Sequence, residues 1–493
     1  MKKITLLIIG ILLVPLFSYS GGIVTNQNQS AAYIRMFARD ASTDIDAVFF
    51  NPAGLTKLGD GFYFSLNNQY ILQNKYVTSN YPYLTGSPVE YQGEVNVPLF
   101  PGIYGAYKKG KFALSLGINP VGGGGSATFD NGLPSFEIPV SNLVPSLQAQ
   151  LEPVDQYIES LSGSNPGFRN ISGYSADIAF EGSSVYWGFQ LNASYEINEI
   201  FSFAVGGRYI SAKNVYTGSF QNVTIDAPEN YGGTQAPGDY LRTVESITGI
   251  TSLGDAADQV DAQTADFEVD VTQSGSGFAP ILGVNISPND QLNIAVKYEF
   301  VAKIELENDT KVDGSGMFPD GEKVRNDMPA MFSAGFDYKI TDKLTVASGF
   351  HTYFDKNANY GKKLDGVYVD NDEVIDRNST EFALGLEYDV SEKLLLSIGY
   401  LHTQTGVTED YQTDLSFSNH SNSIGLGGAY AIKPGIMLNL GVGYTIYNDA
   451  RKIYDYDATE TLGQTIPTRE EYDKDNLFVA LGLDFKFGKK SEN

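Results

Sequence analysis

Apolar and polar residues alternate with a period of two in many stretches of about ten residues along this chain. Because successive side chains of a β-strand point to opposite faces, each stretch predicts a strand with one apolar face and one small or polar face. A clear example is 290–301, whose apolar face carries Leu292, Ile294, Val296, Tyr298 and Phe300. Fourteen strands are predicted, near 61–72, 96–107, 111–119, 184–195, 200–211, 276–287, 290–301, 330–339, 343–353, 379–389, 393–403, 421–432, 435–447 and 476–487.

The connections between these strands alternate between short and long. Short turns such as Lys108-Lys109-Gly110 follow every second strand, and the longest connections cover 120–183 and 212–275. Outer-membrane barrels have an even number of antiparallel strands, short periplasmic turns, long outer loops and both termini in the periplasm. The pattern therefore predicts an all-β fold, a 14-stranded antiparallel transmembrane β-barrel over 61–487 in a bacterial outer membrane. A secreted array of β-sandwiches is the alternative.

The two ends of the chain do not alternate. Lys2 and Lys3 precede an apolar run, and Ser18 and Ser20 follow it, which is typical of a secretory signal peptide over 1–20. An uncleaved anchor is the alternative. No later stretch has the eighteen or so consecutive apolar residues of a membrane-spanning helix. At the other end, residues 488–493 form a polar C-terminal tail.

Residues 21–60 precede the first strand and contain apolar groups, among them Val48, Phe49, Phe50 and Leu55. Exposing such groups to water is costly. A barrel of this size is also too wide to be filled by its own inward side chains. We therefore expect this segment to fold into the lumen as a hatch. An arm that packs on a periplasmic partner is the alternative.

Composition narrows the function further. The 32 Tyr and 29 Phe suit a barrel with aromatic girdles, and the formal net charge of −26 argues against a nucleic-acid partner. The absence of cysteine excludes thiolate chemistry and disulfides. The three histidines are scattered, without metal-ligand spacing, and no nucleophile with a neighbouring base is evident. We expect no enzyme activity, no cofactor and no metal site.

The segment Asn51-Pro52-Ala53-Gly54-Leu55, shortly after Asp40-Ala41 and just before the first strand, resembles the FadL-type long-chain fatty-acid transporters. This outer-membrane transport protein family includes toluene and xylene channels. The likeness extends to the order of signal, hatch and fourteen strands. It implies passive transport of hydrophobic compounds, with capture at the outer loops, a pocket inside the barrel and a shift of the hatch. It assigns the hatch motif to Asn51, Pro52 and Ala53.

The stretch from Gly117 to Gly122 is similar to the family's kinked third strand, beside which the ligand leaves sideways. The resemblance thus implies a kink and lateral opening at Gly117 and Pro120. Independently, Pro120 lacks an N–H and cannot complete a strand ladder. The alternative is that these residues only begin an outer loop.

Two cations fall on lumen faces of the predicted strands, Arg208 and Lys297. Because a buried carboxylate needs a cationic partner, both are candidate anchors for a fatty-acid head group. Pairing of Lys297 with Glu299 is the alternative. We expect a monomer, with outer-membrane lipids and a fatty acid or aromatic hydrocarbon as partners. A porin for polar solutes and a structural or adhesive surface barrel remain the other candidate functions.

Overall fold

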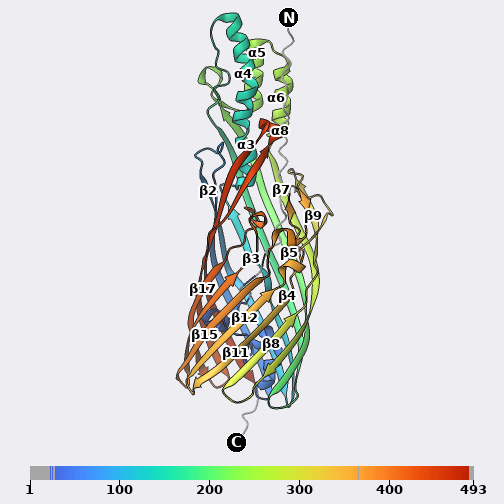
Figure 1. Ribbon diagram of the computed structural model, residues 1–493, viewed down its shortest axis with the longest axis vertical. Helices are drawn as coiled ribbons and strands as arrows, with labels where there is room; N and C mark the ends of the chain where they lie inside the picture. Colours follow the sequence, from blue (N-terminus) through green and yellow to red (C-terminus); the bar gives the residue numbers. More distant parts are fainter. Residues whose placement is uncertain (1–22, 24, 26–27, 365, 488–493) are drawn as a thin grey trace.

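The computed structural model describes residues 23, 25, 28–364 and 366–487. Within them, fourteen antiparallel strands form one closed barrel (Figure 1). The barrel is closed because residues 62–79 of the first strand pair with residues 470–487 of the last strand. The predicted all-β barrel is therefore confirmed. Its strands are β1 (Gly61–Ser79), β2 (Val89–Lys109), β3 (Phe112–Phe129), β4 (Tyr174–Glu196), β5 (Phe201–Asp226), β7 (Phe267–Ile286), β8 (Leu292–Glu299), β11 (Met331–Thr341), β12 (Leu344–Tyr353), β15 (Ser379–Ser391), β16 (Leu394–Gln404), β17 (Ser421–Lys433), β18 (Ile436–Tyr447) and β20 (Gln464–Phe487).

Several strands extend beyond the predicted segments, toward the long connections. β5 continues to Asp226 rather than ending near residue 211, and β20 begins at Gln464 rather than near 476. In such extensions the outward positions are polar, as at Glu90 and Gln92 of β2. An apolar outward face is needed only where a strand meets lipid, so the alternation of apolar and polar residues is clear only in the lower parts of the strands.

An apolar band surrounds the lower part of the barrel. Its exposed side chains include Phe64 of β1, Leu116 of β3, Leu384 of β15 and Leu440 of β18. Exposed apolar surface of this extent is unfavourable in water and is matched by the hydrocarbon of a bilayer.

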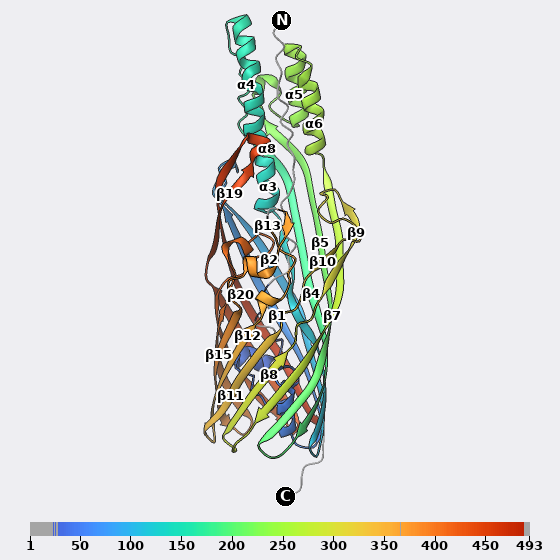
Figure 2. The ribbon, with the colours of Figure 1, turned by 45° about the vertical axis from the view of Figure 1, so that its right-hand side comes forward.

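The long connections carry helices and short strands at the end opposite the short turns (Figures 1 and 2). Helices α3 to α6 form a unit that shares one apolar core with the upper ends of β4 and β5, and this core includes Leu147, Leu151, Tyr240 and Leu253. No described helix is both long enough and apolar enough to cross a membrane. The elements of this end are α3 (Pro134–Ser141), α4 (Leu143–Ser162), η2 (Glu229–Tyr231), β6 (Thr234–Gln235), α5 (Pro237–Thr248), α6 (Ser252–Gln263), β9 (Glu305–Asp313), β10 (Lys323–Arg325), η3 (Asp355–Asn357), β13 (Lys363–Leu364), β14 (Val367–Tyr368), α7 (Asn371–Val374), η4 (Glu409–Tyr411), β19 (Ala450–Ala458) and α8 (Thr459–Leu462).

Residues 28–58, called the hatch below, fold inside the lower part of the barrel (Figure 1). They form α1 (Ala31–Met36), α2 (Ala47–Phe50) and the 3-10 helix η1 (Pro52–Lys57). The hydroxyl of Ser30 caps α1 by accepting from the backbone N–H of Tyr33 at 3.4 Å. Helix α1 contacts β15 to β18 and β20, whereas η1 contacts β2 to β5 and β7. The predicted signal peptide at 1–20 and tail at 488–493 lie outside the described residues.

Wall glycines let the hatch backbone approach the barrel. A Cβ at Gly399 would overlap the carbonyl oxygen of Met36, and one at Gly425 would overlap that of Ile34. Gly399 and Gly425 face each other across β16 and β17. Because any larger residue would fill this space, the two glycines decide where α1 docks.

The two ends of the described chain lie at opposite ends of the barrel. The backbone N–H of Ile23 donates to the hydroxyl of Tyr411 in a long connection at 3.1 Å, whereas Phe487 ends β20 beside the short turns. The prediction that both termini of the chain lie on the short-turn side concerns residues 1–22 and 488–493, which are outside the described residues. The apolar side chain of Ile23 gains burial against Tyr360 and Val374 of the outer connections, which draws this end upward.

Candidate functional site

The ladder between β2 and β3 is interrupted partway up the barrel wall. Residues 96–102 of β2 and 119–126 of β3 make no ladder with each other, although the two strands pair above and below. β3 stays paired with β4 along the same stretch, with register shifts after Pro120 and Gly123. We call the two unpaired stretches the wall break.

Prolines on both strands account for the wall break. Continuing the register from Ile103 opposite Ile118 would place Pro101 opposite Pro120. Neither proline has an N–H to donate, and Pro98 removes a further donor from β2. Pro120 was identified from the sequence, but Pro98 and Pro101 were not, because both of these prolines lie within the predicted strand 96–107. Gly117 lies just below the wall break, paired with Tyr104.

The segment before α1 contributes a side chain to the wall break. The Nε2 of Gln29 donates to the carbonyl of Pro120 at 3.1 Å, and its Oε1 accepts from Nδ2 of Asn119 at 3.1 Å. Gln29 and Asn119 are 2% and 1% exposed, so these polar groups depend on each other for hydrogen bonds. Gln29 therefore gives the carbonyl of Pro120 a hydrogen bond at a place where β2 and β3 form no ladder.

A cavity of about 340 Å³ lies between the hatch and the outer connections. Its lining includes both edges of the wall break, Phe100 on one side and Pro120 to Gly125 on the other. Aromatic rings form another wall, where Tyr216 stacks on Phe180 and on Phe318 with centroid distances of 6.3 and 5.3 Å. The lining combines these aromatic rings with polar side chains such as Gln73 and Lys474, so the cavity suits a ligand that has both an apolar and a polar part.

The hatch motif holds the lower hatch against the wall. The side chain of Asn51 donates to the carbonyl of Val284 at 2.8 Å and accepts from the backbone N–H of Ala53 at 3.2 Å. The carbonyl of Pro52 accepts from the hydroxyl of Ser194 at 2.7 Å, and Ala53 is fully buried. The three residues thus join η1 to β4 and β7.

Arg208 and Lys297 lie together on the barrel wall, against the hatch. Arg208 donates to Glu299 at 2.6 Å and to Gln190 at 2.6 Å, and the Nζ of Lys297 lies 3.4 Å from Glu299. The ring of Phe49 covers both cations, at 4.7 and 5.2 Å from its centroid. The adjoining cavity measures only about 30 Å³, room for about one water molecule. Lys297 thus makes the pair with Glu299 that was the alternative above.

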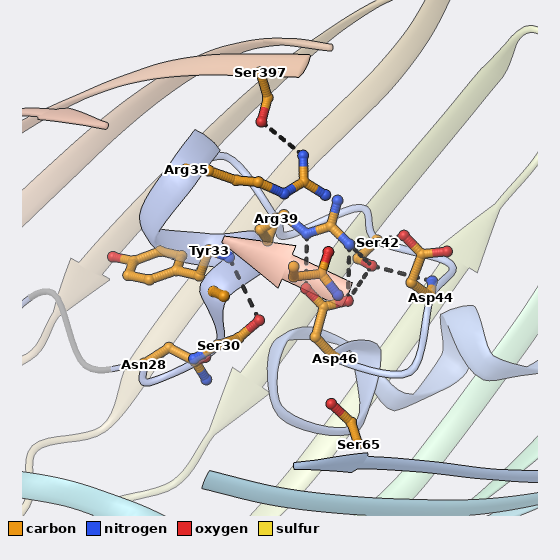
Figure 3. Close-up of polar contacts among 12 residues, drawn as sticks. Asn28, Ser30, Tyr33, Arg35, Arg39, Ser42, Asp44, Asp46, Ser65 and Ser397 are labelled. Carbon is orange, nitrogen blue, oxygen red and sulfur yellow. Dashed lines mark hydrogen bonds and ion pairs between the residues drawn. The ribbon is translucent and has the colours of Figure 1, made fainter. Parts of the chain in front are cut away.

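A polar cluster fixes the turn between α1 and α2 (Figure 3). Arg39 donates to Asp46 at 2.7 Å and to Asp44 at 2.9 Å. Arg35 pairs with Glu387 of β15, which joins α1 to the wall. Breaking a buried ion pair leaves an uncompensated charge, so these contacts make this part of the hatch rigid.

His351 joins the hatch to two wall strands. Its Nε2 lies 2.7 Å from Asp40 of the hatch, and its Nδ1 lies 2.9 Å from Glu381 of β15. Sequence reasoning missed this contact because 311 residues separate Asp40 from His351. No group of three or more His, Asp or Glu side chains in the described part of the chain is arranged to hold a metal ion.

Many solved structures share this fold, including the following two. A FadL homologue of Pseudomonas aeruginosa matches with a TM-score of 0.60 and 13% sequence identity, over 95% of this chain and 100% of its own. The toluene transporter TodX of P. putida matches with a TM-score of 0.52 and 13% identity, over 91% of this chain and 95% of its own. Likeness at such identities shows the fold alone. No curated protein sequence matches the chain significantly.

The family model of the outer membrane protein transport protein (OMPP1/FadL/TodX) matches residues 175–487, more than half of the chain. The match begins in β4 and ends with β20, so it covers most of the barrel wall. It confirms the family that the Asn-Pro-Ala segment suggested. The chain therefore belongs to the OMPP1/FadL/TodX family of outer-membrane transporters of hydrophobic compounds and is not an enzyme.

Proposed function

We propose that this protein passes hydrophobic compounds, and long-chain fatty acids in particular, passively across the outer membrane and releases them sideways through the wall break. The observation that carries this proposal is that one cavity, with aromatic rings in its lining, is bordered by both edges of the interrupted β2–β3 ladder. A ligand in this cavity needs no path down the lumen to reach lipid.

The position of the wall break supports a sideways exit. Leu99 on its outer side is 70% exposed, so an apolar side chain faces outward at the gap. Gly117 and Pro120 bound the place where β3 leaves β2. The glycines at 123 and 124 have no side chain to fill the space there.

The hatch argues against the alternative function, that of a porin for polar solutes. Helix α1, α2 and most of η1 are buried in the lumen, and buried ion pairs and the Asn51-Pro52-Ala53 contacts join them to the wall. A polar solute would have to displace these elements, whereas a ligand in the upper cavity already lies beside the wall break, where Gln29 contacts Pro120.

Arg208 and Lys297 remain candidate anchors for a fatty-acid carboxylate only in a state in which Phe49 has moved away from them. In the structure their hydrogen bonds are taken by Glu299, Gln190 and the hatch. We propose that their first role is to hold Phe49, and thus α2, in place.

A disulfide across the wall break tests the sideways exit. An ideal Cβ at Gly102 lies 3.7 Å from the Cβ of Asn119, within the roughly 3.5–4.5 Å of natural disulfides. The chain has no cysteine, so Gly102→Cys/Asn119→Cys can form only this bond. We expect the oxidised protein to lose most uptake of a labelled fatty acid into proteoliposomes, and reduction to restore it.

The matched control places the disulfide where the ladder is already complete. Leu66 of β1 faces Leu483 of β20 in the closed seam, so Leu66→Cys/Leu483→Cys should leave uptake unchanged. Full uptake through a completely oxidised Gly102→Cys/Asn119→Cys barrel would rule out the sideways exit. Running the assay with toluene as well separates fatty-acid transport from transport of aromatic hydrocarbons.

A further inference from the structure

Two lysines face each other on the lumen side of the seam that closes the barrel. Lys75 of β1 is the direct cross-strand partner of Lys474 of β20, and both side chains line the large cavity. The rung below is polar, Gln73 opposite Asn476, and the next one down is apolar, Ile71 opposite Phe478. The lumen face of the seam thus places a cationic rung above a polar one and an apolar one.

Neither lysine has an anionic partner within the described chain. No carboxylate oxygen of the described residues lies within 4.0 Å of either ammonium nitrogen. Lys474 is held by aromatic rings instead, with its Nζ 4.5 Å from the centroid of Tyr447 and 5.4 Å from that of Phe417. This distinguishes the pair from Lys297, whose carboxylate partner is present in the wall.

The arrangement is unfavourable for an empty cavity. Like charges directly opposite each other on a sheet destabilise it, and partly burying two ammonium groups adds a desolvation cost. An anion between the lysines would offset their repulsion, and charge-assisted hydrogen bonds to it would be strong.

We infer that Lys75 and Lys474 form a binding site for the carboxylate of a ligand whose apolar chain lies over the Ile71–Phe478 rung toward the wall break. The inference rests on the proposed function and names the substrate class, an amphiphile with a single carboxylate. The apolar chain would meet Phe100 on β2, which lines the same cavity. Head-group recognition then takes place above the hatch, separately from Arg208 and Lys297.

Binding of matched ligands to the full-length protein tests the site. The ligands are laurate, 1-dodecanol with the same chain and no charge, benzoate with a carboxylate and no chain, and toluene. We expect Lys75→Met/Lys474→Met to bind laurate at least tenfold more weakly than the unchanged protein, and to bind dodecanol and toluene within twofold of it. Benzoate should bind weakly to both proteins, since it lacks the chain.

Two further variants keep the test decisive. Lys213→Met/Lys303→Met removes two exposed outer lysines and should leave laurate binding unchanged. Lys75→Arg/Lys474→Arg keeps both charges and should retain most of the laurate binding. Each variant is first shown to be folded by the different migration of its heated and unheated samples on a gel.

Equal losses for laurate and dodecanol, or no loss for either, would overturn the inference and leave the proposed transport intact. If the unchanged protein bound neither ligand, the proposed function would fall as well.

Discussion

At the scale of single residues, close approaches to glycine decide how the hatch meets the wall. Asp40 places its carboxylate over Gly349 of β12, where it also reaches His351 at 2.7 Å. A Cβ at position 349 would overlap the second carboxylate oxygen of Asp40. The carboxylate of Asp40 therefore fits against the barrel wall because Gly349 has no side chain.

Gly349→Ala should accordingly loosen the hatch. Overpacking of this kind costs about 1–3 kcal/mol, so we expect faster amide hydrogen exchange in residues 38–46 and a lower unfolding midpoint in urea. Gly105→Ala on β2 is the control, because nothing lies within 4 Å of its Cβ position. Identical behaviour of the two variants would show that the Asp40 contact does not hold the hatch.

A buried lysine should make one outer connection sensitive to pH. Lys362 is 1% exposed, and its Nζ donates to the carbonyl of Tyr411 at 3.3 Å and to the hydroxyl of Ser416 at 3.2 Å. Burial, and secondly the charge of Lys452, lower the pKa of Lys362 from 10.5 to about 7. The opened connection binds the proton up to its ordinary pKa, so the folded packing gains stability as pH rises from about 7 toward 10.5.

Hydrogen exchange measures this effect. After correction for the intrinsic rate, residues 358–364 should be better protected at pH 9 than at pH 7, and Lys362→Met should abolish the difference. Protection that stays constant, or that falls with pH, would contradict the assignment.

At the scale of elements, the outer helices and the hatch belong to separate cores. The core of α3 to α6 contains Leu151, whereas the hatch shares its core with the lower barrel, as Ile34 and Phe478 show. Each core can therefore loosen without the other. The wall break is also an element-scale feature, because prolines on two strands produce it together.

Leu151→Ala should destabilise the helical unit alone. Leu151 is fully buried, and such a truncation costs about 2–5 kcal/mol, so we expect faster proteolysis within α3 to α6. Leu161→Ala on the same helix should have little effect, because Leu161 is 68% exposed. The heat stability of the barrel should be the same in both variants, and a shared drop would mean that the two cores are coupled.

At the scale of the whole molecule, the lumen is closed by a part of the chain that is not barrel. Deleting residues 28–58 should leave the fourteen strands able to close, because the β1–β20 seam does not involve them. It should also open an aqueous path, so that liposomes swell rapidly with sugars, whereas the full chain gives little swelling. An inserted deletion variant that gave no swelling would show that other residues close the lumen.

The sequence by itself determined the barrel. Alternation along a strand is a local property, because the lipid outside the barrel requires an apolar residue at every second position. Strands such as 290–301 could therefore be predicted without knowing which strands lie next to them. The hatch was predictable for the same kind of reason, since Val48, Phe49 and Phe50 need burial wherever they lie.

Only the tertiary structure decided which side chains meet. Lys75 opposite Lys474, Asp40 beside His351, and Gln29 in the wall break all depend on the register in which the sheet closes around the hatch. A shift of one residue would turn each strand's lumen side chains to lipid, and the alternation along a single strand does not say which residue of another strand lies opposite. The pattern therefore determines the wall, and closure of the barrel determines the site.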